Sequence, residues 1–420
     1  MIFYKEANFK ETPIGKIPKT WQVVSIGDVC QQRNEIVQPS MNNKEPFVGL
    51  EHIASGETRL QKFAQSADVK SAKFRFYAGD ILYGKLRPYL DKAVIAIFNG
   101  ICSTDLLVLT PKENVVKEFL IYVLHSNDFI KYAIATTTGT NHPRTSWSAI
   151  SKFKFGLPEY LEQQKIADIL LTVDEAIQKT NEIIAKTERL KKGLMQELLT
   201  KGTGHREFKD TEIGRIPKDW EVVKLGEIGT FQYGITTSAK EEDTGLKLLR
   251  ITDIRDDGTI NWSEVPFCEI SLSELSKYML KVGDVLFARI GATTGKTCYI
   301  NQEIRAVFGS YLIRFLPDVN SQINTKFLHL FTQSEMYWSQ VNRMKGGQLK
   351  KGLNTQLLKE IKILLPPLEE QQKIAQVLST VDKKLEIERN EKAKLEKIKQ
   401  GLMDLLLTGK IRVKVNQIVP

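Results

Sequence analysis

The segment Gly291–Thr297, GATTGKT, comes nearest in this sequence to a motif that could perform chemistry. A phosphate-binding loop of the form GxxxxGK[ST] has four residues between its glycines, whereas this segment has three. That difference matters because the length of the loop sets how its backbone N–H groups surround a phosphate. The following residues, Cys298–Ile300, are typical of a strand and not of the helix that such a loop requires. We therefore expect a positively charged surface loop here, suited to contact with nucleic acid.

Other catalytic motifs are equally poorly matched. Pro317 and Asp318, followed by Glu360–Lys362, loosely resemble the PD…ExK metal site of nucleases, but the gap is long and the second part precedes a predicted helix. The chain has five histidines and no HExxH pair, and it has no Asn-Pro-Pro-aromatic methyltransferase motif. The cysteines are scattered, so we expect reduced, buried thiols at Cys30, Cys102, Cys268 and Cys298. The sequence predicts a protein that binds and does not catalyse.

Most of the sequence is organised as a repeat. Phe9–Val24 reads FKETPIGKIPKTWQVV, and Phe208–Val223, 199 residues later, reads FKDTEIGRIPKDWEVV. Leu157–Met195 begins LPEYLEQQKIADILLTVDEAI, and its copy Leu365–Met403, 208 residues later, begins LPPLEEQQKIAQVLSTVDKKL. The ends of the two repeats are alike and their middles differ. Such a chain predicts two similar frames that hold two different surfaces.

Each repeat has three predicted parts. It opens with an IG-x-IP-x-x-W segment, where glycine and proline mark turns and the tryptophan is expected to fill a core. A mixed region follows, and a long helix ends the repeat. The mixed regions predict strands at Asp80–Tyr83 and Asp284–Phe287 and helices near Glu118–Leu124 and Thr325–Phe331.

The long helices carry heptad patterns. About forty residues at 1.5 Å each give a helix of roughly 60 Å, and one apolar stripe requires a partner stripe, which the other copy supplies. Because each helix ends one repeat, we expect an antiparallel pair. The stripes comprise Ile166, Leu170, Val173, Ile177, Thr180, Ile184, Thr187, Leu194 and Leu198, and Ile374, Leu378, Val381, Leu385, Leu395, Leu402 and Leu406.

The predicted class is therefore α+β: two globular mixed α/β domains separated by a pair of long antiparallel coiled-coil helices, with an internal pseudo-two-fold repeat. Glu388 and Lys392 interrupt the second stripe. That break could fix the register, mark a docking surface, or be a splayed, solvated seam. The predicted parts are a first domain over 1–157, a spacer helix over 158–201, a second domain over 202–365, a second spacer helix over 366–410 and a tail over 411–420.

Charge narrows the range of partners. Sixty lysines and arginines against fifty acids leave a formal charge of +10, which favours a polyanionic partner, although a lysine-rich solvated surface would give the same balance. The sequence has no apolar run of about 18 residues that could span a bilayer. Its first twenty residues lack the apolar stretch of a secretory signal, so we expect no membrane association and a cytoplasmic location.

The IG-x-IP-x-x-W opening, the LPPLEEQQKIA start of the helix, the KGLM-x-x-LLT end and their duplication resemble the specificity (S) subunit of type I restriction-modification systems. The resemblance covers essentially the whole chain. It implies that the variable regions are target-recognition domains, that the helices are spacers, and that this chain has no cofactor of its own. It further implies double-stranded DNA, two methyltransferase (M) subunits and two restriction (R) subunits as partners, which would bind S-adenosylmethionine, ATP and Mg²⁺.

The loops of the variable regions carry cations that suit phosphates, together with amides, hydroxyls and arginines that suit base edges. In the first region the candidates are Lys85, Arg87, Tyr89 and Lys92 in one loop and Asn141, His142, Arg144, Thr145 and Ser146 in another, beside Thr138 and Thr140. In the second region they are Tyr233, Thr236 and Thr237, with Gln232 and Ser238; Arg289, Thr293, Thr294 and Lys296; and Arg343, Lys345, Gln348, Lys350, Lys351 and Asn354.

Two domains joined by a stiff helical pair would meet DNA at two half-sites about 34 Å or more apart. The number of heptads between Val173 and Leu194 would then set the length of the unread spacer. An alternative is a protein-interaction scaffold in which the helices are the functional surface and the charge is incidental. A third hypothesis is a nuclease or ATPase that uses the loop around Lys296.

Overall fold

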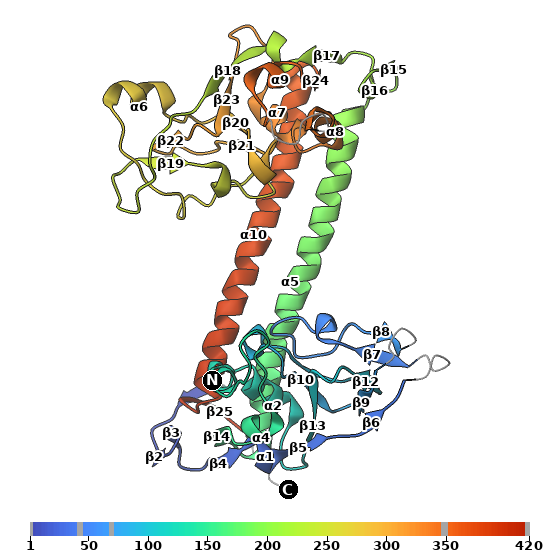
Figure 1. Ribbon diagram of the computed structural model, residues 1–420, viewed down its shortest axis with the longest axis vertical. Coiled ribbons are helices and arrows are strands. Elements are labelled where there is room, and N and C mark those ends of the chain that lie inside the picture. The colour runs from blue at the N-terminus through green and yellow to red at the C-terminus, as the bar shows by residue number, and fades with distance from the viewer. Residues whose placement is uncertain (1–2, 40–44, 67–70, 346–351, 416–420) are drawn as a thin grey trace. The chain divides into compact units, whose positions relative to one another are not determined.

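The chain forms two compact units, of which the first consists of two separate stretches, Met1–Asn181 and Asn390–Pro420. The second unit is the continuous stretch Glu182–Arg389. Two long helices, α5 (Tyr160–Lys201) and α10 (Leu368–Leu406), therefore each contribute residues to both units (Figure 1). Of the 420-residue chain, the computed structural model describes residues 3–39, 45–66, 71–345 and 352–415.

The first unit is built on two sheets. One has the order β11-β10-β13-β5 and is antiparallel, and the other has the order β6-β9-β12-β7-β8, in which β12 and β7 run parallel. Three further pairs are β1–β25, β2–β3 and β4–β14. The strands are β1 (Phe3–Lys5), β2 (Phe9–Thr12), β3 (Gly15–Pro18), β4 (Gln22–Ser25), β5 (Cys30–Arg33), β6 (Ile36–Val37), β7 (Pro46–Val48), β8 (Ala64–Gln65), β9 (Lys73–Phe76), β10 (Ile81–Gly84), β11 (Ala93–Ile95), β12 (Gly100–Cys102), β13 (Leu106–Pro111), β14 (Lys154–Leu157) and β25 (Ile411–Val413).

Helix α2 forms the centre of the first unit. Every residue from Phe119 to Leu124 is buried, which is the pattern of a helix covered on all sides. The same core contains Ile81 from the sheet, Ile166 from α5 and Leu406 from α10. The helices of this unit, besides the parts of α5 and α10, are α1 (Ile26–Val29), α2 (Lys117–Leu124), α3 (Asn127–Ala135) and α4 (Trp147–Ile150).

The second unit repeats this plan with fewer strands. Its main sheet has the order β18-β23-β20-β21, and the pairs β15–β16, β17–β24 and β19–β22 accompany it. Its strands are β15 (Phe208–Thr211), β16 (Gly214–Pro217), β17 (Glu221–Lys224), β18 (Gly229–Tyr233), β19 (Lys247–Leu249), β20 (Val285–Ala288), β21 (Thr297–Tyr299), β22 (Ala306–Phe308), β23 (Leu312–Pro317) and β24 (Lys362–Leu365). Its helices are α6 (Leu272–Tyr278), α7 (Thr325–Phe331), α8 (Glu335–Lys345) and α9 (Thr355–Lys359).

The tryptophan of each opening motif is fixed to the start of a long helix. Trp21 Nε1 donates to Glu162 Oε2 at 3.1 Å, and Trp220 Nε1 donates to Glu370 Oε2 at 2.8 Å. Both rings are buried, so each indole N–H requires an acceptor inside the protein. The neighbouring strands also pair in the same register, β4 with β14 and β17 with β24. Within each repeat, the tryptophan motif and the start of the long helix therefore pack together as one joint.

The glutamine after each glutamate supports a second helix. The backbone N–H of Val116, the N-cap residue of α2, donates to Gln163 Oε1 at 2.8 Å. The N–H of Asn324, the N-cap residue of α7, donates to Gln371 Oε1 at 2.8 Å. Backbone N–H groups at a helix start have no partner within the helix, so a buried amide stabilises this end. The repeated EQQ sequence thus has a structural role.

Helices α5 and α10 run antiparallel. In the second unit, Glu188 and Lys191 of α5 pair with Arg389 and Asp382 of α10, at 2.9 and 2.6 Å. The residue number on α10 falls as that on α5 rises. In the first unit, residues near the start of α5 pack with residues near the end of α10. The predicted α+β class, with two repeats and a long antiparallel helix pair, is confirmed.

Half of the sixteen positions of the two predicted helical stripes are buried, and the other half are partly buried. Ile166, Leu170, Ile374 and Leu378 have no exposed surface. Thr180, also on the stripe, is 7 % exposed, and its hydroxyl donates to the carbonyl oxygen of the preceding helical turn at 2.9 Å. A threonine can therefore occupy the seam without leaving its hydroxyl unpaired.

Three residues near the C-terminus form a strand, which the sequence did not predict. Ile411–Val413 form β25 and pair antiparallel with β1, within the stretch expected as a tail. Arg412 on this strand donates from Nη2 to Glu162 Oε2 at 2.7 Å and from Nη1 to Glu6 Oε2 at 2.6 Å. In the second repeat, His205 after α5 lies 2.9 Å from Glu370. The chain after each long helix thus returns to the glutamate that begins the other.

Candidate nucleic-acid interface

The two predicted loops of the first unit lie side by side. The N–H of Arg87 donates to the carbonyl oxygen of Pro143 at 2.8 Å, and the N–H of Thr145 donates to that of Lys85 at 3.0 Å. Leu86 and Arg144 form an antiparallel bridge between them. We call residues 85–92 and 138–146 the first recognition loops. They place Lys85, Arg87 and Arg144 on adjacent backbone segments.

The first of these loops has an unusual backbone. Arg87 and Asp91 have φ values of 53° and 48°, in the left-handed region that side chains other than glycine rarely adopt. They flank a short 3₁₀ turn, Pro88–Leu90, whose middle residue Tyr89 is 53 % exposed. A non-glycine residue in this region costs about 1–3 kcal/mol and needs support from its surroundings. This conformation presents Tyr89 to solvent beside Arg87.

Some predicted residues of the first unit face inward. Lys92 Nζ donates to the carbonyl oxygen of Leu50 at 2.6 Å. Thr145 is 3 % exposed, and its hydroxyl lies 3.1 Å from that of Thr136. Ser146 is the N-cap of α4 and accepts from the N–H of Ala149. Lys92 and Thr145 thus support the loops from inside, whereas Ser146, Asn141, His142 and Arg144 are exposed.

In the second unit, separate segments converge on Arg289. Its guanidinium carbon lies 5.0 Å from the centroid of the Tyr233 ring, a cation–π contact. The hydroxyl of Tyr233 accepts from the N–H of Thr355 at 3.3 Å. A Cβ added to Gly352 would lie 1.9 Å from the carbonyl oxygen of Arg289, so this position requires glycine. We call residues 232–238, 289–296 and 352–354 the second recognition loops; Arg343, predicted in a loop, lies instead in α8.

Arg289 has an unused donor. Its Nε atom is buried and has no hydrogen-bond partner among the residues that the structure describes. A buried polar group without a partner needs an explanation, and a missing ligand is one. A planar guanidinium held over an aromatic ring matches the paired acceptors of a phosphate or of a guanine edge. Arg289 is therefore the candidate with the strongest geometric support.

The other predicted residues of the second unit divide into two groups. Thr236, Arg343 and Asn354 are exposed, and Asn354 is also the N-cap of α9. Thr294 is 5 % exposed and donates to the carbonyl oxygen of Gly291, and Thr293 donates to that of Ile290. Thr237 donates to a backbone oxygen at 3.4 Å. Gln348, Lys350 and Lys351, and the side chain of Lys345, lie outside the described residues.

Lys296 contacts a different part of the second unit from Arg289. It forms an ion pair with Asp256. With Asp256, Met195, Leu199 and Trp338 it lines a cavity of about 650 Å³ beside α5. Residues Gly291–Thr293 form a 3₁₀ turn and Thr297–Tyr299 form β21, so no helix follows the loop as a phosphate-binding loop requires.

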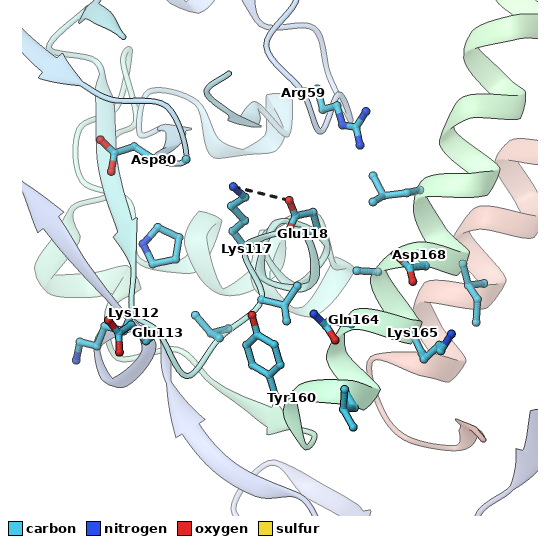
Figure 2. A pocket seen from close by; sticks show the side chains of 18 of the residues that line it. Arg59, Asp80, Lys112, Glu113, Lys117, Glu118, Tyr160, Gln164, Lys165 and Asp168 are labelled. Carbon is cyan, nitrogen blue, oxygen red and sulfur yellow. Dashed lines mark ion pairs between the residues drawn. The ribbon is translucent and has the colours of Figure 1, made fainter. Parts of the chain in front are cut away.

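A groove of about 1740 Å³ in the first unit lies beside the start of α5 (Figure 2). Tyr160 and Gln164 on α5 face Lys117 and Glu118 across it, and the latter two form an ion pair at 4.0 Å. Tyr160 and its neighbour Leu161 are 49 % and 54 % exposed. Two large apolar side chains on one exposed turn are suited to contact with another protein.

The features of a catalytic site are absent from the part of the chain that the structure describes. No group of three or more His, Cys, Asp or Glu residues there could hold a metal ion. Two residues of the poorly matched nuclease motif form ion pairs, Glu360 with Lys224 at 2.7 Å and Lys362 with Glu212. All four cysteines are buried free thiols, and burial raises the pKa of Cys30 to about 12. No described helix has the length and apolarity needed to cross a membrane.

Sequence reasoning missed the residues that hold the recognition loops. His125 and Asp91 are 2.6 Å apart although 34 positions separate them, and Arg389 contacts both Glu188 and Asp257. The sequence carries no local pattern for such pairs. The one available signal was the charged break in the second helical stripe, which adjoins Arg389.

Comparison with known proteins agrees with this arrangement. A family model described as the type I restriction modification DNA specificity domain matches residues 18–189 and 217–397. The chain is 32% identical to the specificity subunit of the type I restriction enzyme MjaVIII of Methanocaldococcus jannaschii, over 99% of this chain and 98% of that subunit. It is 22% identical to the HindI specificity subunit of Haemophilus influenzae, over 93% and 99%. Its fold is similar to that of a type I S subunit from M. genitalium, with a TM-score of 0.61 at 16% identity, over 92% of this chain and 96% of that one.

Proposed function

The chain belongs to the family of type I restriction-modification DNA specificity subunits, and we propose that it recognises a DNA target made of two separate half-sites. The observation that carries the proposal is the convergence of candidate DNA contacts in each unit: Lys85, Arg87 and Arg144 in the first, and Tyr233 with Arg289 in the second. The two sets differ in composition. Two different half-sites would follow, because side-chain identity decides which base edges are accepted.

The formal charge of +10 supports this proposal, since cations that neutralise phosphates release condensed counterions on binding. Subunits of this family do not catalyse reactions, so the chemistry belongs to the partners. We propose that S-adenosylmethionine, ATP and Mg²⁺ bind to those partners and that this chain binds none of them. We place the complex in the cytoplasm, where its DNA target would be.

We further propose that the chain holds two M subunits and two R subunits. Support for two equivalent docking sites comes from the repeated helix starts. Tyr160 at the start of α5 is 49 % exposed, and Leu368, 208 positions later at the start of α10, is 38 % exposed. Exposed apolar side chains at equivalent places in a repeat would let two identical subunits bind alike.

The test is to co-express this chain with its M subunit in a host without DNA methylation and to map modified bases across the genome. A split motif with two unlike halves and a fixed gap supports the proposal. A continuous motif, or no modification from an assembled complex with an M subunit that binds its cofactor, contradicts it.

A further inference from the structure

In the second unit, one turn lies between the helix pair and a recognition loop. Arg389 of α10 contacts Asp257 Oδ2 through Nη1 at 3.2 Å and Glu188 Oε1 of α5 through Nη2 at 2.9 Å. The preceding residue, Asp256, pairs with Lys296 at the end of the loop 289–296. The turn is therefore held by Arg389 of α10, which also binds Glu188 of α5, and it contacts the end of the recognition loop through the exposed Asp256.

The first unit has the same arrangement with different residues. Lys399 of α10 contacts Asp174 Oδ1 of α5 at 2.6 Å and donates to the carbonyl oxygen of Gly56 at 3.4 Å. The hydroxyl of Thr58 donates to Asp174 Oδ2 at 3.3 Å. The N–H of Gly56 donates to the carbonyl oxygen of Asp91, in the recognition loop, at 2.9 Å. The turn 54–58 thus corresponds in role to the turn around Asp257.

A buried histidine strengthens the link in the first unit. His125 Nε2 lies 3.0 Å from the carbonyl oxygens of both Glu57 and Ala93, and its Nδ1 lies 2.6 Å from Asp91 Oδ1. Carbonyl oxygens only accept hydrogen bonds, so Nε2 must carry a proton. The contact of Nδ1 with Asp91 joins the histidine to the recognition loop. This contact holds Asp91 in its left-handed conformation.

We propose that Arg389 and Lys399 are positioning residues for DNA recognition, each fixing the recognition loop of its own unit to the helix pair through the intervening turn. The inference rests on the proposed function. Base readout requires that side chains stay within about 0.5 Å of their working positions. A loop released from its turn still carries its cations, so it loses discrimination between bases more than it loses overall attraction to DNA.

The experiment uses the assembled complex with its M subunit and compares Lys399→Gln with Arg389→Gln. Genome-wide methylation is scored at sites that differ from the target by one base in either half. We expect Lys399→Gln to raise methylation at first-half mismatches about tenfold and to leave the second half strict. Arg389→Gln should raise methylation at second-half mismatches about threefold and leave the first half strict. The effect is smaller because the Arg389 side chain is 48 % exposed and its ion pairs are weaker.

Matched controls remove the same charge from α10 elsewhere. Lys394→Gln and Lys384→Gln alter exposed lysines in the first and second units, and both should keep wild-type discrimination. Lys399→Arg and Arg389→Lys retain the positive charge, and these variants should largely keep the wild-type discrimination between bases. Equal loss at both half-sites, or unchanged discrimination in a variant whose complex assembles, overturns the inference. If a variant fails to assemble, Thr58→Val and Asp257→Asn test the same turns, with the same half-site specificity required.

The failure of the proposed function has a different outcome. In that case the wild-type complex itself methylates no split motif, whereas failure of the positioning inference leaves a split motif in the wild type and no half-specific change in the variants.

Discussion

Lys191 on α5 lies 2.6 Å from Asp382 on α10, and the same ion pair recurs with its helices exchanged. The residues 208 positions away are Lys399 on α10 and Asp174 on α5, also 2.6 Å apart. One pair lies in each unit. The sequence repeat is therefore a repeat of interhelical contacts, as a pseudo-two-fold relation requires.

In the second unit, the aspartate of this pair, Asp382, also has a second lysine nearby. Burial lowers the pKa of the neighbouring Lys326, while Asp382 raises it. Asp382 thus faces two cations, and Asp382→Asn would leave both without their counter-charge. We expect this change to lower the free energy of unfolding by about 2 kcal/mol, and Lys191→Met by less than about 1 kcal/mol. Urea denaturation followed by tryptophan fluorescence measures the free energy of unfolding of both variants. Equal losses in the two variants would contradict the argument.

Glu370 should make the joint at Trp220 sensitive to acid. Burial alone raises the pKa of this carboxyl, but hydrogen bonds from Thr203, His205 and Trp220 outweigh it and hold the pKa below its ordinary value of 4.5. A lowered carboxyl pKa contributes stability above pH 4.5, which is lost as pH falls toward the folded-state pKa. Glu370→Gln should destabilise the protein at neutral pH and flatten the dependence below pH 4.5. Glu369→Gln, at an exposed neighbour, is the control, and parallel curves for Glu370→Gln and wild type would rule out this role.

His329 should make the stability of the protein depend on pH in a higher range than Glu370 does. Burial, with the nearby cations Lys326 and Lys191, lowers the pKa of this histidine to about 3. The folded protein therefore favours the neutral ring, so stability is complete above pH 6.5 and falls by about 1.4 kcal/mol per pH unit below it. Hydrogen exchange of α7 between pH 7 and 5 should show this loss in the wild type and not in His329→Gln. The exposed His142→Gln should behave as the wild type, and an unchanged slope in His329→Gln would refute the assignment.

The sequence predicted the frame of this protein better than its sites. The repeats carry Trp21, Trp220, Glu162 and Glu370 at matching offsets, so two like joints and two long helices could be predicted, although not the hydrogen bonds across 141 and 150 positions that connect them. The sequence did not predict β25, because a strand of three residues in a basic segment is too short to show a periodic pattern of apolar residues.

The sequence also predicted only part of the geometry of the recognition loops. Cations after the strands β10 and β20 marked segments that the structure brings beside other predicted loops, but backbone geometry decides which side chains face outward. Arg87 lies in the left-handed region and Thr294 turns into its own loop, and neither conformation follows from residue type. Lys296 was grouped with Arg289 by proximity in sequence, yet it pairs with Asp256.

Helix length should determine the gap between the half-sites. Inserting one heptad into α5 between Val173 and Leu194, with a matching heptad in α10, lengthens each helix by about 10 Å, which corresponds to roughly three base pairs. We expect methylation mapping to show both half-sites unchanged and the gap enlarged. Replacing seven residues with another heptad of equal length is the control. An unchanged gap from an active complex would reject the proposed role of the helices.

Arg289 should set the second half-site through its planar shape as well as its charge. The guanidinium lies against the Tyr233 ring at 5.0 Å, and its Nε has no acceptor among the described residues. Arg289→Lys retains the charge but loses the stacking and the paired donors. Discrimination at one base of the second half-site should therefore fall about 10- to 100-fold, corresponding to ~1–3 kcal/mol, with little change in salt dependence. Competition binding with duplexes altered at single bases measures this loss. Tyr233→Phe keeps the ring and should have a smaller effect, whereas a uniform loss across all bases would assign Arg289 to a phosphate.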